Sequence, residues 1–351
     1  MEPRKRTSKN IIWTMISLLL AILTVQVILK QNRDMSFSDL IDIIRSSNKI
    51  FVVLSMLSAV LYVWFESIAI WGILKKAGYK RSPLKCLLYS TSDVYFSAIT
   101  PSASGGQPAS AYFMRKDGIP GGTITATLVL NLIMYTVSVV FLGLISIVIR
   151  PGTFASFGTS SRAFITFGFF GLTVLTVGFF ILLKNGSLIF NPLTRLIDFA
   201  YRKKIIKNKE AALARLEKVG NDYHTCSGLI SNSKRILIYA FVWNLLQRIN
   251  QLIVPSYIYA ALGGNRSDMV TVFAKQCLVT IGYNCIPIPG GLGISDFLMI
   301  DGFTPVMGES MAYSVELISR GITFYICVAI SGLITLAAYI WRKHKDDDRS
   351  L

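Results

Sequence analysis

The sequence predicts an all-α polytopic membrane protein of about six transmembrane helices and two re-entrant helical hairpins, arranged as an inverted repeat. The first observation behind this prediction is composition. The 351 residues are 52% hydrophobic and only 16% charged, whereas soluble domains carry about 25% charged residues. The second is that the apolar residues form long runs, and positive charges gather in alternate loops. The third is that two shorter apolar stretches are interrupted by glycine and proline.

Six apolar runs are long enough to span a membrane, because about 18 or more helical residues cross a hydrocarbon core of about 30 Å. The segment 1–6 before the first run is basic, as in a signal peptide. However, no small-x-small cleavage site precedes Lys30. We therefore expect the first run to be a retained anchor helix. The six runs are 11–29, 51–74, 123–149, 163–183, 236–261 and 311–341.

Lysine and arginine are distributed unevenly between the loops. Of the 36, the loops on one side hold 26 and the loops on the other side hold seven. Such a bias marks the cytoplasmic side of a membrane protein. We therefore expect a multi-pass protein of the cell (cytoplasmic) membrane with both termini in the cytoplasm. Basic loops beside anionic lipid headgroups also account for the net charge of +17, so no nucleic acid partner is expected.

Cysteine and histidine give no sign of a metal or redox centre. The five cysteines are scattered without Cys-x-x-Cys spacing, and the two histidines, His224 and His344, lie in basic segments. No disulfide framework, metal site or cofactor is expected. The chain also lacks a Walker-type nucleotide loop, which argues against ATP-driven pumping by this chain.

The chain is expected to be a single integral membrane domain, 1–351, that contains two related halves. Repeat one covers 50–149, and repeat two covers 235–341. The basic cytoplasmic segment 184–235 joins them. Apolar residues around 193–200 in this segment fit either a helix on the membrane surface or a plain connecting helix.

Each repeat contains an apolar stretch broken by glycine and proline. The first interrupted segment, 84–116, lies between cytoplasmic markers, so it is expected to enter the membrane from inside. The second interrupted segment, 269–303, lies between external loops and is expected to enter from outside. Exposed backbone at membrane depth is tolerated only beside protein or a wet cavity. Paired interrupted segments in two inverted halves point to the binding site of a transporter.

The residues at the two breaks are candidates for binding an anion. Gly105, Gly106 and Gln107 precede a half-helix whose free amides and positive dipole end favour negative charge. At the second break, Gly290 and Gly291 precede a half-helix with Asp296 in its first turn. The alternative is that these glycines only permit tight helix crossings. Because each of the two inverted halves has such a break with proline, we favour a binding site over tight helix crossings alone.

Arg248 is the strongest candidate among the charged residues in apolar runs. It lies near the middle of the run 236–261, and Asn244 and Gln247 share its helical face. Because a charge in a bilayer is unfavourable, such residues usually face a cavity or a substrate pathway. The polar stripe therefore predicts that Arg248 contacts substrate.

Three further charged residues are weaker candidates. Arg320 continues a polar stripe in the last run, although it could simply pair with Glu316 four residues earlier. Lys275 lies in the second interrupted segment and could instead extend to the membrane surface. Asp93 lies in the first interrupted segment, and Glu66 lies in the run 51–74. The alternative to a functional role for either residue is that it merely caps a helix or pairs with a neighbouring arginine.

Two motifs resemble those of the lysylphosphatidylglycerol synthase/flippase transmembrane family. They are Thr-Pro-Ser-Ala-Ser-Gly-Gly-Gln-Pro-Ala at 100–109 and Pro-Ile-Pro-Gly-Gly-Leu-Gly-Ile-Ser-Asp at 287–296. The family commonly has glutamate at the position of Asp296. In the similar multiple-peptide-resistance proteins, a soluble synthase domain follows the membrane part, whereas this chain ends at Leu351. The resemblance therefore implies the lipid-translocating half without the synthase half.

The resemblance and the broken helices together favour flipping of a charged-headgroup phospholipid, such as lysylphosphatidylglycerol or a related anionic or polyprenyl lipid. The alternative is a component of a phosphatidylglycerol lysyltransferase system that confers resistance to cationic antimicrobial peptides, which would need a separate soluble synthase. A regulatory or scaffold protein would have little use for buried charges. We expect a membrane lipid as the partner and no catalytic residue; homo-oligomerisation is left open.

Overall fold

The computed structural model describes residues 46–100, 105–203, 208–286, 288, 291 and 293–348. Within these residues the chain is helical and contains no strand. The predicted anchor helix 11–29 lies outside the described residues, and so does Gly290.

The first half of the described chain matches the predicted pattern of helix, interrupted segment and helix. Ser82 caps α4, because its side chain accepts a hydrogen bond from the Lys85 amide, and Pro83 occupies the first turn, where no amide hydrogen is needed. The partners α4 and α5 pack against each other. The helices are α3 (Lys49–Lys76), α4 (Pro83–Ile99), α5 (Gly106–Lys116) and α6 (Gly121–Ile149).

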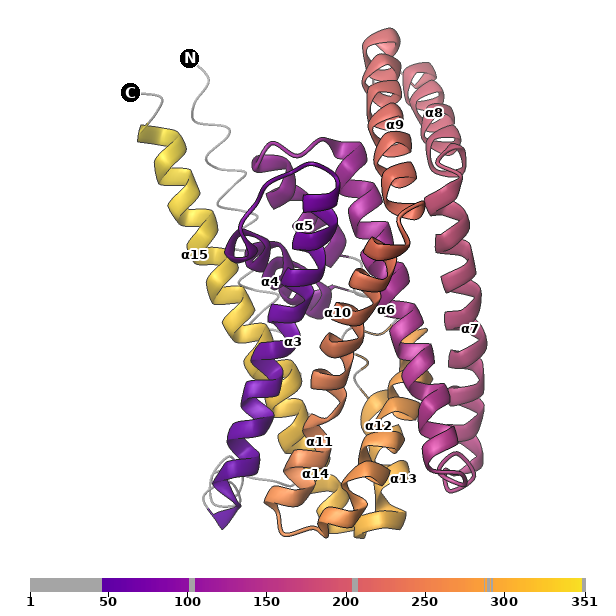
Figure 1. The fold of residues 1–351 in the computed structure, drawn as a ribbon, viewed down its shortest axis with the longest axis vertical. Helices are drawn as coiled ribbons and strands as arrows, with labels where there is room; N and C mark the ends of the chain where they lie inside the picture. Colours follow the sequence, from indigo (N-terminus) through magenta and orange to yellow (C-terminus); the bar gives the residue numbers. More distant parts are fainter. Residues whose placement is uncertain are drawn as a thin grey trace.

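The middle of the chain forms one long apolar helix and a helical pair. The pair, α8 and α9, pack on each other and extend beyond the other labelled helices at the upper end of Figure 1. The Tyr223 hydroxyl donates a 2.8 Å hydrogen bond to the Leu182 carbonyl, which ties α9 to α7. The helices are α7 (Thr159–Lys184), α8 (Ser187–Arg202) and α9 (Lys209–Ser231).

The predicted run 236–261 forms two helices rather than one. They meet at Ile253, because Pro255 has no amide hydrogen to continue the α-helical ladder. The later run 311–341 forms helices joined by a π-helical turn, Gly321–Ile326. The helices of this half are α10 (Lys234–Leu252), α11 (Val254–Ala261), α12 (Met269–Asn284), α13 (Ile294–Met307), α14 (Glu309–Arg320) and α15 (Cys327–Asp348).

Within the described residues, four helices are long and apolar enough to cross a membrane. The helix α10 lies beside these helices but does not meet the criteria. It ends at Leu252, before the apolar residues of α11, and it carries the polar stripe around Arg248. The four are Lys49–Lys76, Gly121–Ile149, Thr159–Lys184 and Glu309–Ile340.

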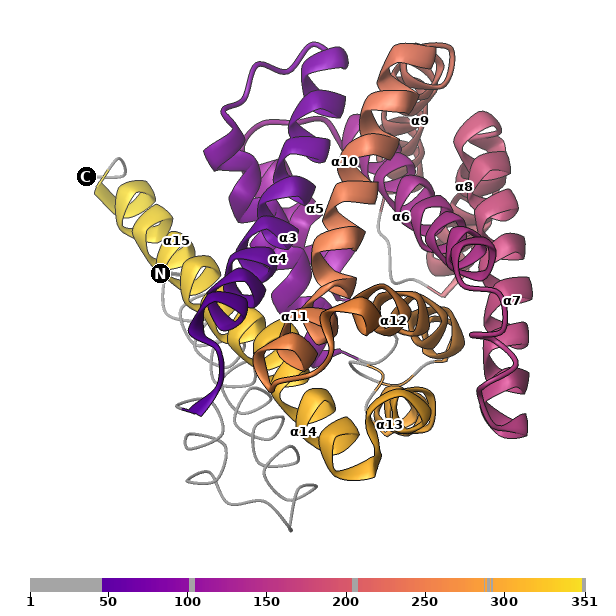
Figure 2. The ribbon, with the colours of Figure 1, turned by 60° about the horizontal axis from the view of Figure 1, so that its bottom comes forward.

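The two interrupted segments lie toward opposite ends of the molecule. In Figure 1, α4 and α5 lie in the upper part, whereas α12 and α13 lie in the lower part beside α11 and α14. Figure 2 brings this lower group forward. Between the two groups, α10 packs against both α3 and α6, and α7 packs against both α6 and α12. Helices from the two halves therefore pack against one another in the middle of the molecule.

Candidate functional site

A cavity of about 610 Å³ lies among helices of both halves. Its walls come from α3, α4, α6, α7, α10, α12, α15 and the π-helical turn, together with residues of both breaks. Six of the twelve predicted site residues line it, namely Asp93, Gln107, Asn244, Gln247, Arg248 and Gly291. The cavity therefore brings residues from both interrupted segments together with the polar stripe of α10.

The polar stripe of α10 is buried and makes contacts to two neighbouring helices. Asn244 donates a 3.0 Å hydrogen bond to the Asn131 side chain of α6. Gln247 donates a 3.0 Å hydrogen bond to the Glu66 carboxylate of α3. Both side chains are almost completely buried. These two bonds fix the rotation of α10, so that the next residue, Arg248, faces the cavity.

The Arg248 guanidinium lies between two aromatic rings. Its central carbon is 4.9 Å from the ring centroid of Tyr62 and 4.4 Å from that of Tyr135. One terminal nitrogen donates a 2.6 Å hydrogen bond to Gln251. Such ring contacts favour a cation without neutralising it.

Arg248 forms no ion pair with any described carboxylate. Its side chain is only 5% exposed, and its Nε donor has no hydrogen-bond partner within the described residues. A buried cation is unfavourable unless an anion or strong acceptors accompany it. The cavity beside Arg248 can therefore accommodate an anionic group.

Two carboxyl groups lie in the same cavity as Arg248. The Glu66 carboxylate accepts hydrogen bonds from Ser90 at 2.9 Å and from Gln247 at 3.0 Å. The Asp93 carboxylate accepts from Ser97 and from Gln107, each at 3.1 Å. These carboxyl groups are neighbours, and both interact electrostatically with Arg248. The cavity thus offers one cation and a pair of acidic groups.

At the first break, Gln107 lines the cavity, whereas Gly105 and Gly106 do not. The Gly105 amide is already occupied, since it donates a 2.8 Å hydrogen bond to the Thr100 hydroxyl. At Gly106 an added Cβ would lie 1.8 Å from the Asp93 carboxylate oxygen. The glycine therefore permits the close approach that lets Gln107 reach Asp93.

At the second break, the end of α12 and the backbone after it line the cavity. Gly291 has a φ of +65°, and a Cβ at this position would lie 2.7 Å from the Tyr283 ring. Both features favour glycine. The next residue of α12, Asn284, exchanges hydrogen bonds with Tyr135: the tyrosine hydroxyl donates at 2.9 Å and the amide donates back at 2.6 Å.

Asp296 and Arg320 form a separate cluster that does not line the cavity. The Arg320 Nε lies 2.9 Å from the Asp296 carboxylate and 3.8 Å from Glu316. Arg320 also donates to the Ser295 hydroxyl, and the Gly293 amide donates to Asp296 at 2.8 Å. The closer partner of Arg320 is therefore Asp296 of α13 rather than Glu316 of its own helix.

Lys275 lies apart from the cavity and from the Arg320 cluster. Its ammonium donates to the Ser156 hydroxyl and lies 4.7 Å from the ring centroid of Phe157. The side chain is 2% exposed. These contacts join α12 to the connection between α6 and α7.

Several residues that line the cavity were not among the predicted site residues. Tyr62 and Tyr135 flank Arg248, and Asn284 binds Tyr135. Their signal in the sequence is spacing: Tyr62 precedes Glu66 by one helical turn, and Tyr135 follows Asn131 by one turn. An aromatic residue in an apolar helix, however, usually packs in the core or against lipid.

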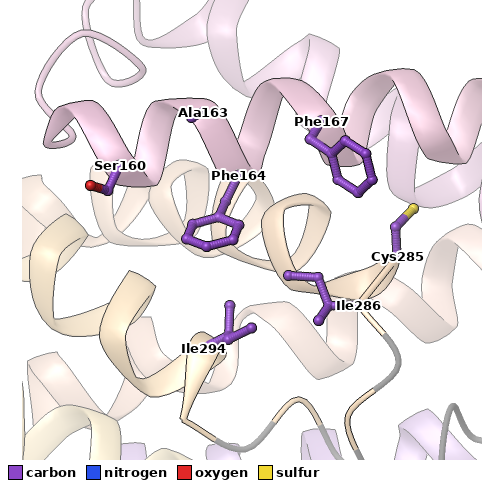
Figure 3. Close-up of a pocket in the computed structure, with 7 residues that line it drawn as sticks. All are labelled: Ser160, Ala163, Phe164, Phe167, Cys285, Ile286 and Ile294. Atoms are coloured by element: carbon purple, nitrogen blue, oxygen red, sulfur yellow. The ribbon is translucent and has the colours of Figure 1, made fainter.

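An apolar groove of about 640 Å³ lies beside the second break. Figure 3 shows the side chains of Phe164 and Phe167 on α7 facing Ile286 and Ile294 across this groove. Cys285 and Ile286 line both the groove and the central cavity.

The fold and cavity define a helical membrane protein with a charged internal site. Over residues 12–331 the chain matches the family described as the lysylphosphatidylglycerol synthase TM region. Because the match covers most of the 351 residues, the chain belongs to this family and is a multi-pass membrane protein. No curated protein and no solved structure is significantly similar to it.

Proposed function

We propose that this protein translocates a phospholipid with a charged headgroup, such as lysylphosphatidylglycerol or a related anionic or polyprenyl lipid, across the cell membrane. The observation that carries the proposal is Arg248, a buried arginine without a described ion-pair partner in a cavity lined by both breaks. A lipid phosphate would neutralise it through charge-assisted hydrogen bonds.

The cavity also suits an amine on the headgroup. Asp93 and Glu66 lie in the same cavity as Arg248, so an aminoacylated headgroup could place its phosphate against the arginine and its ammonium against the carboxyl groups. Asp296 is held by Arg320 outside the cavity, which leaves Asp93 as the better candidate for the amine. Gln247 and Gln251 would orient the groups that bind.

We propose six membrane spans and two re-entrant hairpins related as an inverted repeat. The order α3, α4–α5, α6 corresponds to α10–α11, α12–α13, α14–α15. The positions of α4–α5 and α12–α13 toward opposite ends of the molecule support this arrangement (Figure 1).

We further propose that the end bearing the basic loops faces the cytoplasm, which places both termini there. The basic residues at the ends of α3 and α5 lie toward the same end as the α8–α9 pair in Figure 1. The excess of lysine and arginine in these loops supports the orientation.

A second candidate function is participation in lysylphosphatidylglycerol synthesis, which the description of the family favours. In that case a separately encoded soluble partner would transfer lysine from lysyl-tRNA, and this chain would supply the membrane part. Homo-oligomerisation is compatible with either function.

Reconstitution in liposomes separates the two candidates. Purified protein would be incorporated into vesicles that contain phosphatidylglycerol with a fluorescent acyl chain, and outward-facing probe would be reduced chemically. We expect faster exchange of the probe between leaflets without tRNA or nucleotide, and exchange slower by about 10- to 100-fold in Arg248→Ala. Wild-type vesicles no faster than empty vesicles would overturn the proposal. Lysine transfer from lysyl-tRNA to phosphatidylglycerol by the chain alone would overturn the preference for transport, and transfer that needs a soluble partner as well would support the second candidate.

A further inference from the structure

We infer that one acyl chain of the translocated phospholipid leaves the central cavity through the apolar groove between α7 and the second break, the groove shown in Figure 3. This inference rests on the proposed function, because it requires the headgroup to occupy the cavity beside Arg248.

The groove and the cavity are adjacent spaces with a shared wall. Cys285 and Ile286 line both, and they follow directly after the last helical residue of α12, Asn284. The end of the helix thus places the side chains of Cys285 and Ile286 between the charged cavity and the groove.

The helix α7 contributes to both spaces from different parts of its length. Phe164 and Phe167 line the groove, whereas Leu172 and Leu175 line the cavity. Between them, α7 and α12 are in direct contact at Gly168, where a Cβ would lie 1.9 Å from the Ile281 carbonyl oxygen. The two helices are too close at Gly168 for a chain to pass between them, so a connection between the groove and the cavity must run along Cys285 and Ile286, which line both.

The lining of the groove indicates what can occupy it. Apart from the Ser160 hydroxyl, the side chains that line it are apolar. A polar group would find almost no hydrogen-bond partner there, whereas a hydrocarbon chain needs none. A phospholipid whose headgroup is bound near Arg248 also carries two acyl chains, and a cavity of about 610 Å³ is too small to hold both of them together with the headgroup. We therefore expect the headgroup in the cavity and one fatty acyl chain in the groove.

The position of the groove along α7 indicates which leaflet of the membrane it faces. It lies near the amino-terminal end of α7, which begins at Thr159, the end opposite the α8–α9 pair in Figure 1. In the proposed orientation this is the external end. The acyl chain would therefore pass between the cavity and the outer leaflet.

Photolabelling tests the groove independently of transport. The probe is phosphatidylglycerol with a diazirine on one acyl chain, and labelled peptides of the full-length protein are identified by mass spectrometry. We expect labelling of Phe164, Phe167 or Ile286, and at least a fivefold decrease of this labelling in Arg248→Ala. Labelling around Val174, an exposed residue of α7 that lines neither space, should be unchanged.

Two matched tryptophan variants test whether the groove is needed for transport. Ala163→Trp fills the groove, whereas Val174→Trp adds the same side chain to another exposed position of α7. We expect at least a tenfold slower transport in Ala163→Trp and wild-type transport in Val174→Trp, with similar melting temperatures for both. Groove labelling that is independent of Arg248, or full transport by Ala163→Trp, would overturn the inference. Absence of transport by the wild type with labelling still dependent on Arg248 would instead refute the proposed function alone.

Discussion

The guanidinium of Arg248 lies 4.4 Å from the ring centroid of Tyr135, and Tyr135 exchanges hydrogen bonds with Asn284 at the end of α12. The arginine of one helix is thereby connected to the second break through a single aromatic side chain. An anion that binds Arg248 would therefore lie one side chain away from the position where α12 ends.

The first prediction concerns Arg248 itself. Arg248→Ala should slow lipid exchange in liposomes by about 10- to 100-fold, because a hydrogen bond to a charged group contributes about 1.5–3 kcal/mol. Arg248→Lys should recover only part of the rate, since an ammonium cannot bind a phosphate with two parallel hydrogen bonds. Exchange and melting temperature should be measured on the same preparations. A stable Arg248→Ala protein with the wild-type rate of lipid exchange would show that Arg248 is not part of the binding site.

The same variants test whether Arg248 serves mainly to stabilise the fold. A purely structural role as partner of Glu66 or Asp93 would make Arg248→Ala unstable, and neutralising the carboxyl group as well would restore stability. The described ion pairs do not include either carboxylate with Arg248, so we expect no such rescue.

The second prediction concerns the carboxyl groups of the cavity. Asp93→Asn should slow exchange of lysylphosphatidylglycerol more than exchange of phosphatidylglycerol, because only the first carries amines that a carboxylate can bind. The matched control is Glu309→Gln, which removes an exposed carboxylate of α14 outside the cavity. Equal effects of Asp93→Asn on the two lipids would show that this carboxylate does not recognise the amine.

The third prediction concerns packing at the first break. Gly106→Ala places a Cβ 1.8 Å from the Asp93 carboxylate and 2.0 Å from the Ser97 hydroxyl, so α5 must move away from α4. We expect a lower melting temperature and slower exchange. Gly228→Ala in α9 is the control, because a Cβ there meets nothing within 4 Å. Replacing a helical glycine by alanine, where the added Cβ meets no other atom, should leave the stability of the protein unchanged or increase it.

The fourth prediction concerns topology. In a background without native cysteines, a cysteine at Asp117, between α5 and α6, should react with an impermeant reagent only from the cytoplasm. A cysteine at Asn265, between α11 and α12, should react only from outside, and so should one at Ile288 in the second break. Reaction of the cysteines at Asn265 and Ile288 from the cytoplasm alone would refute the inverted repeat.

The helices and breaks were largely predictable from the sequence, and their contacts were not. Glycine and proline have local conformational effects, so the segment predicted over 84–116 forms α4 and α5 over 83–116, and the segment predicted over 269–303 forms α12 and α13 over 269–307. The division of 236–261 at Ile253 was missed, because a single proline in a long apolar run often only bends a helix.

Side-chain pairing depends on tertiary structure, which explains the remaining differences. Arg320 was a candidate site residue, and the alternative was that it pairs with Glu316 on its own helix, a contact that helical spacing can predict. Its closest carboxylate belongs to Asp296, in a different helix. Tyr62 and Tyr135 were missed for the same reason, since only the packing of α3 and α6 against α10 brings them to Arg248.

The last prediction tests whether Asp296 and Arg320 are a structural pair. Their atoms lie 2.9 Å apart, and the side chains are only 24% and 9% exposed. Asp296→Asn removes the anion and leaves Arg320 with Glu316 at 3.8 Å as its nearest described carboxylate. We expect a loss on the order of 2 kcal/mol, measured as a lower melting temperature, because a buried arginine then loses its closest carboxylate. The double variant Asp296→Asn/Arg320→Gln should recover part of the loss, since the cation that lost this carboxylate is removed as well. If Asp296→Asn keeps wild-type stability but loses lipid exchange, the carboxylate acts on substrate rather than on the fold.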